Sequence, residues 1–231
     1  MKKLLIFVLG VVLFVSCAKE NNNTMYVKGH VKGLKKGTLY LQKQVDSLVM
    51  SIDSVKVNGS EDFILTDEVL SPEMYYLALG NSDKKIPFFG EKDSITITSK
   101  LDRFVLNAKI SGSENQDLLN KFYEIKDKFR DQNLDMIKEE FEAKRSGVQD
   151  SVLLVQNKMK NLLRRKYLYT TNFAINNADY EVAPYIALTE LNNATIKLLD
   201  TVNKSLSPEV KASKYGVQLN EFILQIKATE Q

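Results

Sequence analysis

Residues 110–129, ISGSENQDLLNKFYEIKDKF, contain the change of pattern that decides the fold. Before Gly112-Ser113, short stretches rich in Val, Ile, Tyr, Phe and Thr are separated by Gly, Asn, Asp and Lys, which is typical of β-strands and turns. After it, apolar residues recur at steps of four and three, at Leu118, Phe122, Ile125 and Phe129, which indicates an amphipathic helix. The sequence therefore predicts an α+β protein, with a β domain over residues 25–111 and an all-helical module over residues 112–231.

The β domain is expected to consist of short strands joined by tight turns. Residues 94–98 alternate strictly between polar and apolar, which predicts a strand with one buried face. Asn58-Gly59 predicts a hairpin turn, because both residues tolerate positive φ. Closely spaced hairpins favour an antiparallel β-sandwich or a partly open barrel. Strands are expected at residues 26–31, 38–43, 48–57, 62–66, 74–79, 86–89, 94–98 and 104–111.

The helical module is expected to begin with two long helices. Ile137 and Phe141 continue the first apolar stripe at a shifted phase, and Ser146-Gly147 interrupts it. The two stripes predict an antiparallel helical hairpin. The second stripe passes through Val152, Val155, Met159 and Leu162.

Shorter helices are expected after this hairpin. Pro184 suits the first turn of a third helix, and Ser207-Pro208 reads as an N-cap followed by Pro at the first helical position. The third helix is expected to contain Ile186, Leu188, Leu191 and Leu198, and a last short helix to contain Leu219, Phe222, Ile223 and Ile226.

The first 16 residues have the pattern of a secretory signal peptide. Lys2 and Lys3 precede an apolar run over residues 4–15, and the small residue Ser16 follows it. The run is shorter than the ~18 apolar residues of a membrane-spanning helix. Cys17, the only cysteine of the chain, comes next, and residues 17–24 form a polar tether. A single cysteine provides no intramolecular disulfide, so packing has to stabilise the fold.

Residues 14–17, Phe-Val-Ser-Cys, resemble a bacterial lipobox. The resemblance implies that the Cys17 thiol receives a diacylglycerol and that the leader is then removed, which would anchor the protein in a membrane. Ala18 carries no inner-membrane retention signal, so the expected location is the outer membrane of the cell envelope, facing the periplasm or the surface. The alternative is an ordinary secreted protein with an unmodified cysteine.

The β domain resembles a domain of unknown function found in cell-envelope lipoproteins of Bacteroidota. That domain usually precedes a thioredoxin-like domain of the thiol:disulfide interchange type. This chain ends at Gln231 without a Cys-x-x-Cys pair, so the resemblance implies compartment and fold but no redox activity. The resemblance is carried by residues 27–34, 37–41, 52–55, 72–77 and 110–113, and in the helical module by residues 206–211 and 213–216.

Composition and motifs give little sign of catalysis or of a cofactor. The 231 residues carry a formal net charge of +3, which falls to about +1 once Lys2 and Lys3 are removed, so nucleic acid is not an expected partner. No dinucleotide, P-loop, zinc-protease or calcium-loop motif occurs, and we expect no cofactor and no metal. His30, the only histidine, is interpreted as a strand residue with a local hydrogen bond rather than as a general base.

Two charged segments of the helical module have a structural and a functional interpretation. Glu139-Glu140 and Glu142 could bind a metal, but such acids beside basic residues are usually a solvated helix face. The run Arg164-Arg165-Lys166, with Tyr167 and Tyr169, could contact anionic headgroups or an acidic glycan. The structural interpretation is a helix whose long side chains cover apolar neighbours.

A recurring Asp-Ser/Thr-aliphatic pattern resembles the acceptor signal of the general O-glycosylation system of Bacteroidota envelopes. Asp-Ser pairs also occur at turns and caps, and Asp150 could cap the second long helix. The candidate acceptors are Ser47, Ser54, Ser94, Ser151 and Thr201.

The leading expectation for function is a non-enzymatic, membrane-anchored lipoprotein that acts as a binding or scaffolding module in the cell envelope. Its partners would be the membrane, through the lipid anchor, and an envelope protein or glycan. One alternative is an accessory to a separate thioredoxin-like oxidoreductase. A third is a glycan hydrolase with two carboxylates brought together by the fold.

Overall fold

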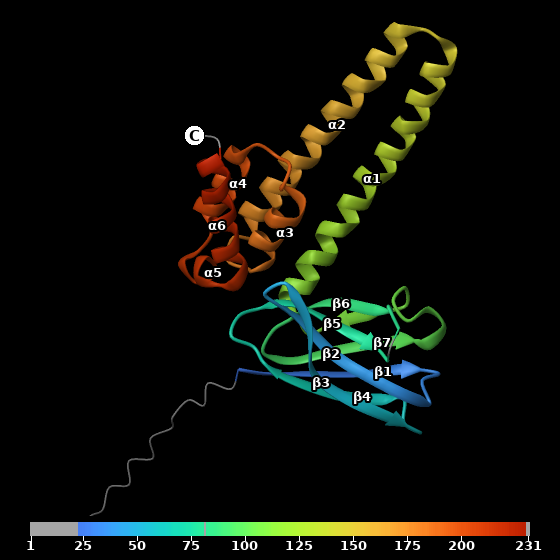
Figure 1. The fold of residues 1–231 in the computed structure, drawn as a ribbon, viewed down its shortest axis with the longest axis vertical. Helices are drawn as coiled ribbons and strands as arrows, with labels where there is room; N and C mark the ends of the chain where they lie inside the picture. Colours follow the sequence, from blue (N-terminus) through green and yellow to red (C-terminus); the bar gives the residue numbers. More distant parts are fainter. Residues whose placement is uncertain (1–22, 81, 230–231) are drawn as a thin grey trace, which may run out of the picture.

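The computed structural model describes residues 23–80 and 82–229, so Cys17 and the leader lie outside the described residues. Figure 1 shows two stacked β-sheets, a long pair of helices that projects away from them, and a group of shorter helices packed beside the base of that pair. The expected order, strands first and helices second, is confirmed.

Two four-stranded sheets form the β domain. The first has the order β4-β1-β7-β8 and the second the order β3-β2-β5-β6, and over the described residues they do not close into a barrel. All neighbouring strands are antiparallel except β1 and β7, which are parallel. The bounds are β1 (Thr24–Lys32), β2 (Lys36–Val45), β3 (Leu48–Asn58), β4 (Asp62–Glu68), β5 (Glu73–Leu79), β6 (Lys85–Gly90), β7 (Asp93–Lys100) and β8 (Lys109–Ser111).

The expected hairpin at Asn58-Gly59 is wrong, although the turn itself exists. Gly59 has φ +92°, as the sequence suggested, but β3 and β4 belong to different sheets. Val57 before the turn and Phe63 after it are both buried in the core between the sheets, so the chain crosses from one sheet to the other. At this edge, the backbone N–H of Thr66 donates to Asp53 Oδ2 at 2.9 Å.

The strand expected at residues 104–111 is also shorter than predicted. A 3-10 helix at Leu101–Arg103 leads into a turn, and only Lys109–Ser111 pairs as β8. The turn is held by Phe104, whose side chain is buried and whose carbonyl accepts a hydrogen bond from Ser99 Oγ at 2.5 Å. Burial of one aromatic ring therefore replaces strand pairing in this segment.

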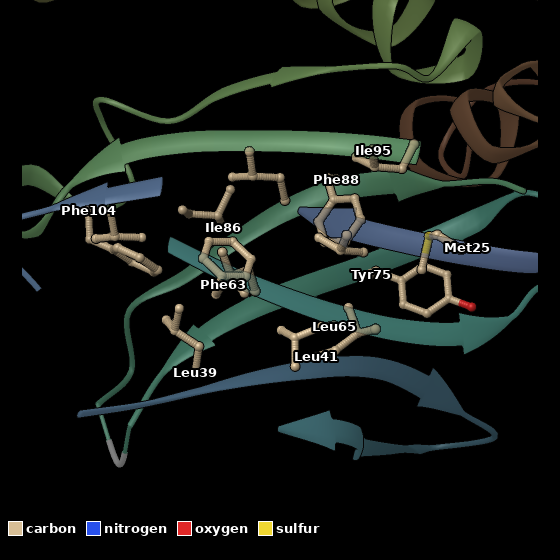
Figure 2. Packing of buried hydrophobic residues seen from close by; sticks show 14 of the residues in the cluster. Met25, Leu39, Leu41, Phe63, Leu65, Tyr75, Ile86, Phe88, Ile95 and Phe104 are labelled. Carbon is tan, nitrogen blue, oxygen red and sulfur yellow. The ribbon is translucent and has the colours of Figure 1, made fainter. Parts of the chain in front are cut away.

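Alternation along the strands builds the core between the sheets. In β1, Met25, Val27 and Val31 point inward, while Tyr26 and Lys28 are exposed. Figure 2 shows side chains of both sheets meeting in this layer. The largest fully buried side chains there include Leu39, Leu41, Leu65, Tyr75, Ile86, Phe88 and Ile95.

Gly112 makes the passage from strand to helix possible. It has φ +96°, and a Cβ at this position would lie 2.2 Å from the carbonyl oxygen of Ser94. Next to it, the Ser113 hydroxyl accepts a hydrogen bond from the N–H of Gln116 at 3.0 Å and caps helix α1 (Glu114–Ser146). Only glycine combines this backbone conformation with so close an approach.

Helix α1 and helix α2 (Gln149–Asn176) form the expected antiparallel hairpin, and Gly147, with φ +74°, ends α1. The third helix is in fact two, α3 (Val182–Glu190) and α4 (Ile196–Ser205), because Asn192-Asn193 lie in a turn, where Asn is favoured over a helix interior. Ser207 caps α5 (Pro208–Ala212) as predicted, and α6 (Lys214–Thr229) is the last helix. Within residues 23–80 and 82–229, no helix combines the length and apolar character of a membrane span.

Candidate functional site

The helical module and the second sheet share a core, which we call the seam. Met74 on β5 and Phe89 on β6 are cross-strand neighbours that turn away from the other sheet and pack against the helices. The Phe89 ring centroid lies 5.5 Å from that of Tyr185 and 6.0 Å from that of Tyr215. The other buried members are Leu119, Phe122, Val182 and Ile186.

Polar side chains of the helices complete the seam by pairing with backbone groups. The N–H of Met74 donates to the Tyr215 hydroxyl at 3.0 Å, and the N–H of Phe89 donates to Gln116 Oε1 at 2.8 Å. Burial raises the pKa of Tyr215, although the hydrogen bond from Met74 opposes this, so the hydroxyl stays protonated. These bonds fix the helical base against the sheet, and the hairpin projects beyond it (Figure 1).

A group of charges, which we call the charge cluster, lies where the seam reaches one end of the sandwich. Lys43 Nζ lies 2.6 Å from Asp67 Oδ2 and 3.4 Å from Glu73 Oε1, and the Tyr75 hydroxyl donates to Asp67 at 2.7 Å. Lys214 on α6 pairs with Glu73 and donates to the Gln44 carbonyl. The charge cluster therefore ties α6 to β2 and β5.

The protonation states in the charge cluster follow from this geometry. Burial lowers the pKa of Lys43, but the hydrogen bond to Asp67 and the charges of Glu73 and Asp67 outweigh it, so the pKa is raised. Burial, together with the hydrogen bond to Asp67, raises the pKa of Tyr75 far above its usual value. Lys43 is thus charged and Tyr75 neutral at physiological pH, which suits an electrostatic tie rather than proton transfer.

A cavity of about 680 Å³ with acidic walls lies beside the start of β1. Burial, with the nearby charges of Glu91 and Glu209, raises the pKa of Glu181 in its wall, while a hydrogen bond from Asn115 opposes the rise. Among the described residues, no group of three or more His, Cys, Asp or Glu is arranged to hold a metal ion. The residues that line this cavity include Asn23, Leu70, Glu91, Lys92, Glu181 and Glu209.

The projecting hairpin carries an apolar surface that faces away from its own core. Leu134, Ile137 and Phe141, which we call the outer stripe, are 54%, 46% and 69% exposed. At 3.6 residues per turn, Phe141 lies roughly 160° around α1 from Ala143, which is buried between the two helices. The shifted phase of Ile137 and Phe141 in the sequence is explained by this outward position.

The charged residues near the outer stripe form the solvated face that the sequence suggested. Glu139 pairs with Lys158 at 2.9 Å, and Glu140 pairs with Lys144 at 2.9 Å. Glu142 is exposed on the same helix. Most charges here are therefore neutralised locally, and the apolar outer stripe is the distinctive feature of the hairpin.

The basic run on α2 divides between structural and exposed roles. Lys166 pairs with Glu190 at 3.0 Å and Arg165 donates to Gln132 at 3.3 Å, so both contact neighbouring helices. Tyr169 stacks on Phe122 with ring centroids 6.1 Å apart. Arg164 lies on the rim of a shallow cavity of about 410 Å³, lined also by Leu163, Tyr167, Leu168 and Leu198.

His30 lies on a strand and has local polar contacts, as the structural interpretation of this residue expects. Its Nδ1 lies 2.9 Å from Asp62 Oδ1, and its Nε2 lies 3.2 Å from Glu61 Oε2. The ring is half exposed on the outer face of β1, away from the seam and the hairpin.

The structure scatters the candidate glycosylation residues over separate elements. Asp46 and Asp93, which precede two of them, have positive φ; Asp46 lies in the β2–β3 turn and Asp93 begins β7, which agrees with the structural interpretation of Asp-Ser pairs. The alternative that Asp150 caps the second long helix does not hold, because Val148 is the N-cap and Asp150 lies in the first turn of α2. Ser47 is exposed in the β2–β3 turn, Ser54 and Ser94 are exposed on strands, Ser151 is partly buried, and Thr201 donates to the Lys197 carbonyl.

Sequence reasoning missed both the seam and the outer stripe. The consecutive apolar pairs Met74-Tyr75 and Phe88-Phe89 were the available signal for the seam, since a strand covered on both faces loses its alternation. Leu134 could have been found from its i, i+3, i+7 spacing with Ile137 and Phe141.

Comparison with known families finds a match for the first part of the chain. No curated protein and no solved structure matches the chain. The match covers residues 25–119, a segment that runs beyond the last strand into the first residues of α1 and includes Gln116 and Leu119 of the seam. Residues 25–119 match the family described as "Domain of unknown function (DUF4369)".

Proposed function

We propose that the protein is a non-enzymatic, membrane-anchored binding module of the cell envelope that presents its helical hairpin to a partner protein. The observation that carries the proposal is the outer stripe, three large apolar side chains left exposed on the projecting hairpin. Exposed apolar surface of this kind marks interaction sites.

The shape of the molecule supports this proposal. The seam fixes the helical base to the sheet, while α1 and α2 extend beyond every other element (Figure 1). An amphipathic helix of a partner could pack along the outer stripe in the i, i+3, i+7 geometry of helix pairs. The proposed anchor at Cys17 and the proposed outer-membrane location are inferred from the resemblance of residues 14–17 to a lipobox. The proposed origin in a Bacteroidota envelope is inferred from the resemblance of the β domain to a domain of lipoproteins from these bacteria.

Replacing the anchor residue tests the membrane part of the proposal. We expect Cys17→Ser to release the protein from sedimented envelope membranes into the soluble fraction, because the acyl chains would provide most of its membrane affinity. Fractionation and intact-mass measurement of the native protein check this. A variant that sediments like wild type, with native protein that carries no acyl groups, would contradict the anchor.

Charged substitutions in the outer stripe test the binding part. We expect the double variant Ile137→Glu, Phe141→Glu to reduce the yield of photo-crosslinks between a probe at Leu134 and a partner protein at least about tenfold. The reason is that desolvated apolar anchors dominate helix interfaces. Glutamate keeps the helix propensity of α1, so circular dichroism should not change. The matched control is Leu224→Glu, at a site 56% exposed on α6. Crosslinking that survives the double change, or falls equally in the control, would refute the assignment.

A further inference from the structure

We propose that the end of the sandwich at which β1 begins docks into the lipid bilayer, with the β2–β3 turn and Leu70 entering its interface. The inference rests on the proposed function, because it takes Cys17 as the membrane anchor. It adds a second, protein-based membrane contact, and hence a fixed orientation of the domain.

Strand directions place these residues at one end, which we call the anchor end. Thr24 at the start of β1 pairs with Glu68 at the end of β4, and the N–H of Val69 donates to the Asn23 carbonyl at 2.8 Å. Leu70 follows directly. A cavity of about 480 Å³ is lined by both Leu70 and Val45, which brings the end of β2 to the same place.

The anchor end is unusually apolar for a strand turn. Leu70 is 92% exposed and Leu48 69%, and Val49 and Met50 are each 49% exposed. Val45 pairs directly with Leu48 across the turn. Because consecutive residues point to opposite faces, both faces of the β2–β3 turn carry exposed apolar side chains, so one flat partner surface would leave half of them in water.

The length of chain before β1 identifies the bilayer as the occupant. Residues 17–23, fully extended, span at most about 25 Å, so an anchor at Cys17 keeps the anchor end within that distance of the membrane. Tethering at this distance gives the bilayer a large advantage over a freely diffusing partner.

The charges at the anchor end restrict the kind of bilayer. The acidic cavity, with Glu91, Glu181 and Glu209, opens beside Asn23, while Lys43 and Lys214 are engaged by Glu73. Lys92 in the wall of the same cavity is outnumbered by these acids, so the groups together carry no excess of positive charge that would attract an anionic surface. The chemistry fits the interface of a zwitterionic leaflet, entered by apolar side chains.

The sequence allows a direct test, because it contains no tryptophan and one cysteine. Residues 17–231 carrying Leu48→Trp are coupled through Cys17 to a maleimide-headgroup lipid in vesicles of phosphatidylethanolamine and phosphatidylcholine. Tryptophan emission is measured with and without brominated acyl chains. The matched control is Leu106→Trp, at a site 84% exposed after β7, which runs parallel to β1 and so ends away from the anchor.

We expect the Leu48→Trp emission to shift to the blue on coupling and to fall roughly twofold with brominated chains, because an interfacial side chain sits at the acyl boundary. Leu106→Trp should show neither effect, and vesicles rich in phosphatidylglycerol should weaken the quenching at Leu48→Trp. Equal quenching at the two sites would overturn the proposal. A blue shift that appears without vesicles and grows with protein concentration would also overturn it and assign this end to a second copy.

Failure of this proposal is distinguishable from failure of the proposed function. Chemical coupling replaces natural acylation, so docking is measured whether or not the cell acylates Cys17. Native protein without acyl groups contradicts the anchor alone, and an unquenched Leu48→Trp on coupled vesicles contradicts the docking surface alone.

Discussion

Phe89→Ala is expected to lower the free energy of unfolding by about 4 kcal/mol, the range for removing a fully buried aromatic ring. The ring fills the seam between β6, Tyr185 and Tyr215, so its loss leaves a cavity between the sheet and the helices. Urea denaturation, followed by circular dichroism at a helical wavelength and by the NMR signals of β-strand amides, measures the change. Because the seam is shared, both signals should shift together.

Phe141→Ala is the matched control for Phe89→Ala. It removes the same ring from a position 69% exposed, where we expect a change within about 0.5 kcal/mol. If Phe89→Ala moved the transition of the β-strand amides and left the helical one in place, the two parts would be unfolding independently. That result would contradict a seam that couples the helical module to the sheet.

Lys43→Met is expected to destabilise the protein by about 3 kcal/mol at neutral pH, near the lower end of the range for removing one partner of a buried ion pair. The change leaves Asp67 without its 2.6 Å partner, and leaves Glu73 with Lys214 alone. The Lys43 side chain is 18% exposed, so water offsets part of the cost. Denaturant titration of the purified protein measures the difference.

The pH dependence of this difference has a definite sign. The folded pKa of Lys43 is raised, so its stabilisation is fully present below the unfolded value of about 10.4 and is lost as the pH rises through the folded pKa. The difference in free energy of unfolding between wild type and Lys43→Met should therefore be constant from neutral pH to about pH 10 and become smaller above that. The change in Tyr75 ionisation at high pH affects both proteins, and their difference isolates Lys43.

Lys56→Met provides the control for the charge cluster. Lys56 lies exposed on β3, and its replacement should change stability by less than about 0.5 kcal/mol. A Lys43→Met protein as stable as this control would show that the charge cluster is no more than a surface pair. A gap that widened at high pH would contradict the assigned direction of the pKa.

Local patterns predicted the elements well and their connections less well. The strands at β1 to β7, the hairpin of α1 and α2, and the cap at Ser207 all follow from alternation, from 3.6-residue spacing or from capping chemistry. The third helix was overextended because Leu191 and Leu198 keep the apolar spacing across a turn. The last strand was overextended because burial of Phe104 outweighs strand pairing.

The candidate site shows the same division. The sequence placed Ile137 and Phe141 on a continued apolar stripe, and their phase shift was an unused signal, because a residue off the core stripe of a helix faces outward. The charge cluster joins Lys43, Asp67 and Lys214, which are far apart in the chain, and no spacing rule relates them. The anchor end likewise combines the β2–β3 turn with Leu70 only because β2 and β4 both end beside the start of β1.

The order of residues alone settled that strands come first, that helices follow Gly112-Ser113, and that Cys17 is the chain's only thiol, because periodicity, glycine conformation and composition are local properties. Tertiary structure decided that Asn58-Gly59 carries the chain from one sheet to the other, that β1 and β7 run parallel, and that Phe89 joins the sheet to the helices. A turn permits a reversal within one sheet or between two, and only the burial of Val57 and Phe63 in a common core selects between them.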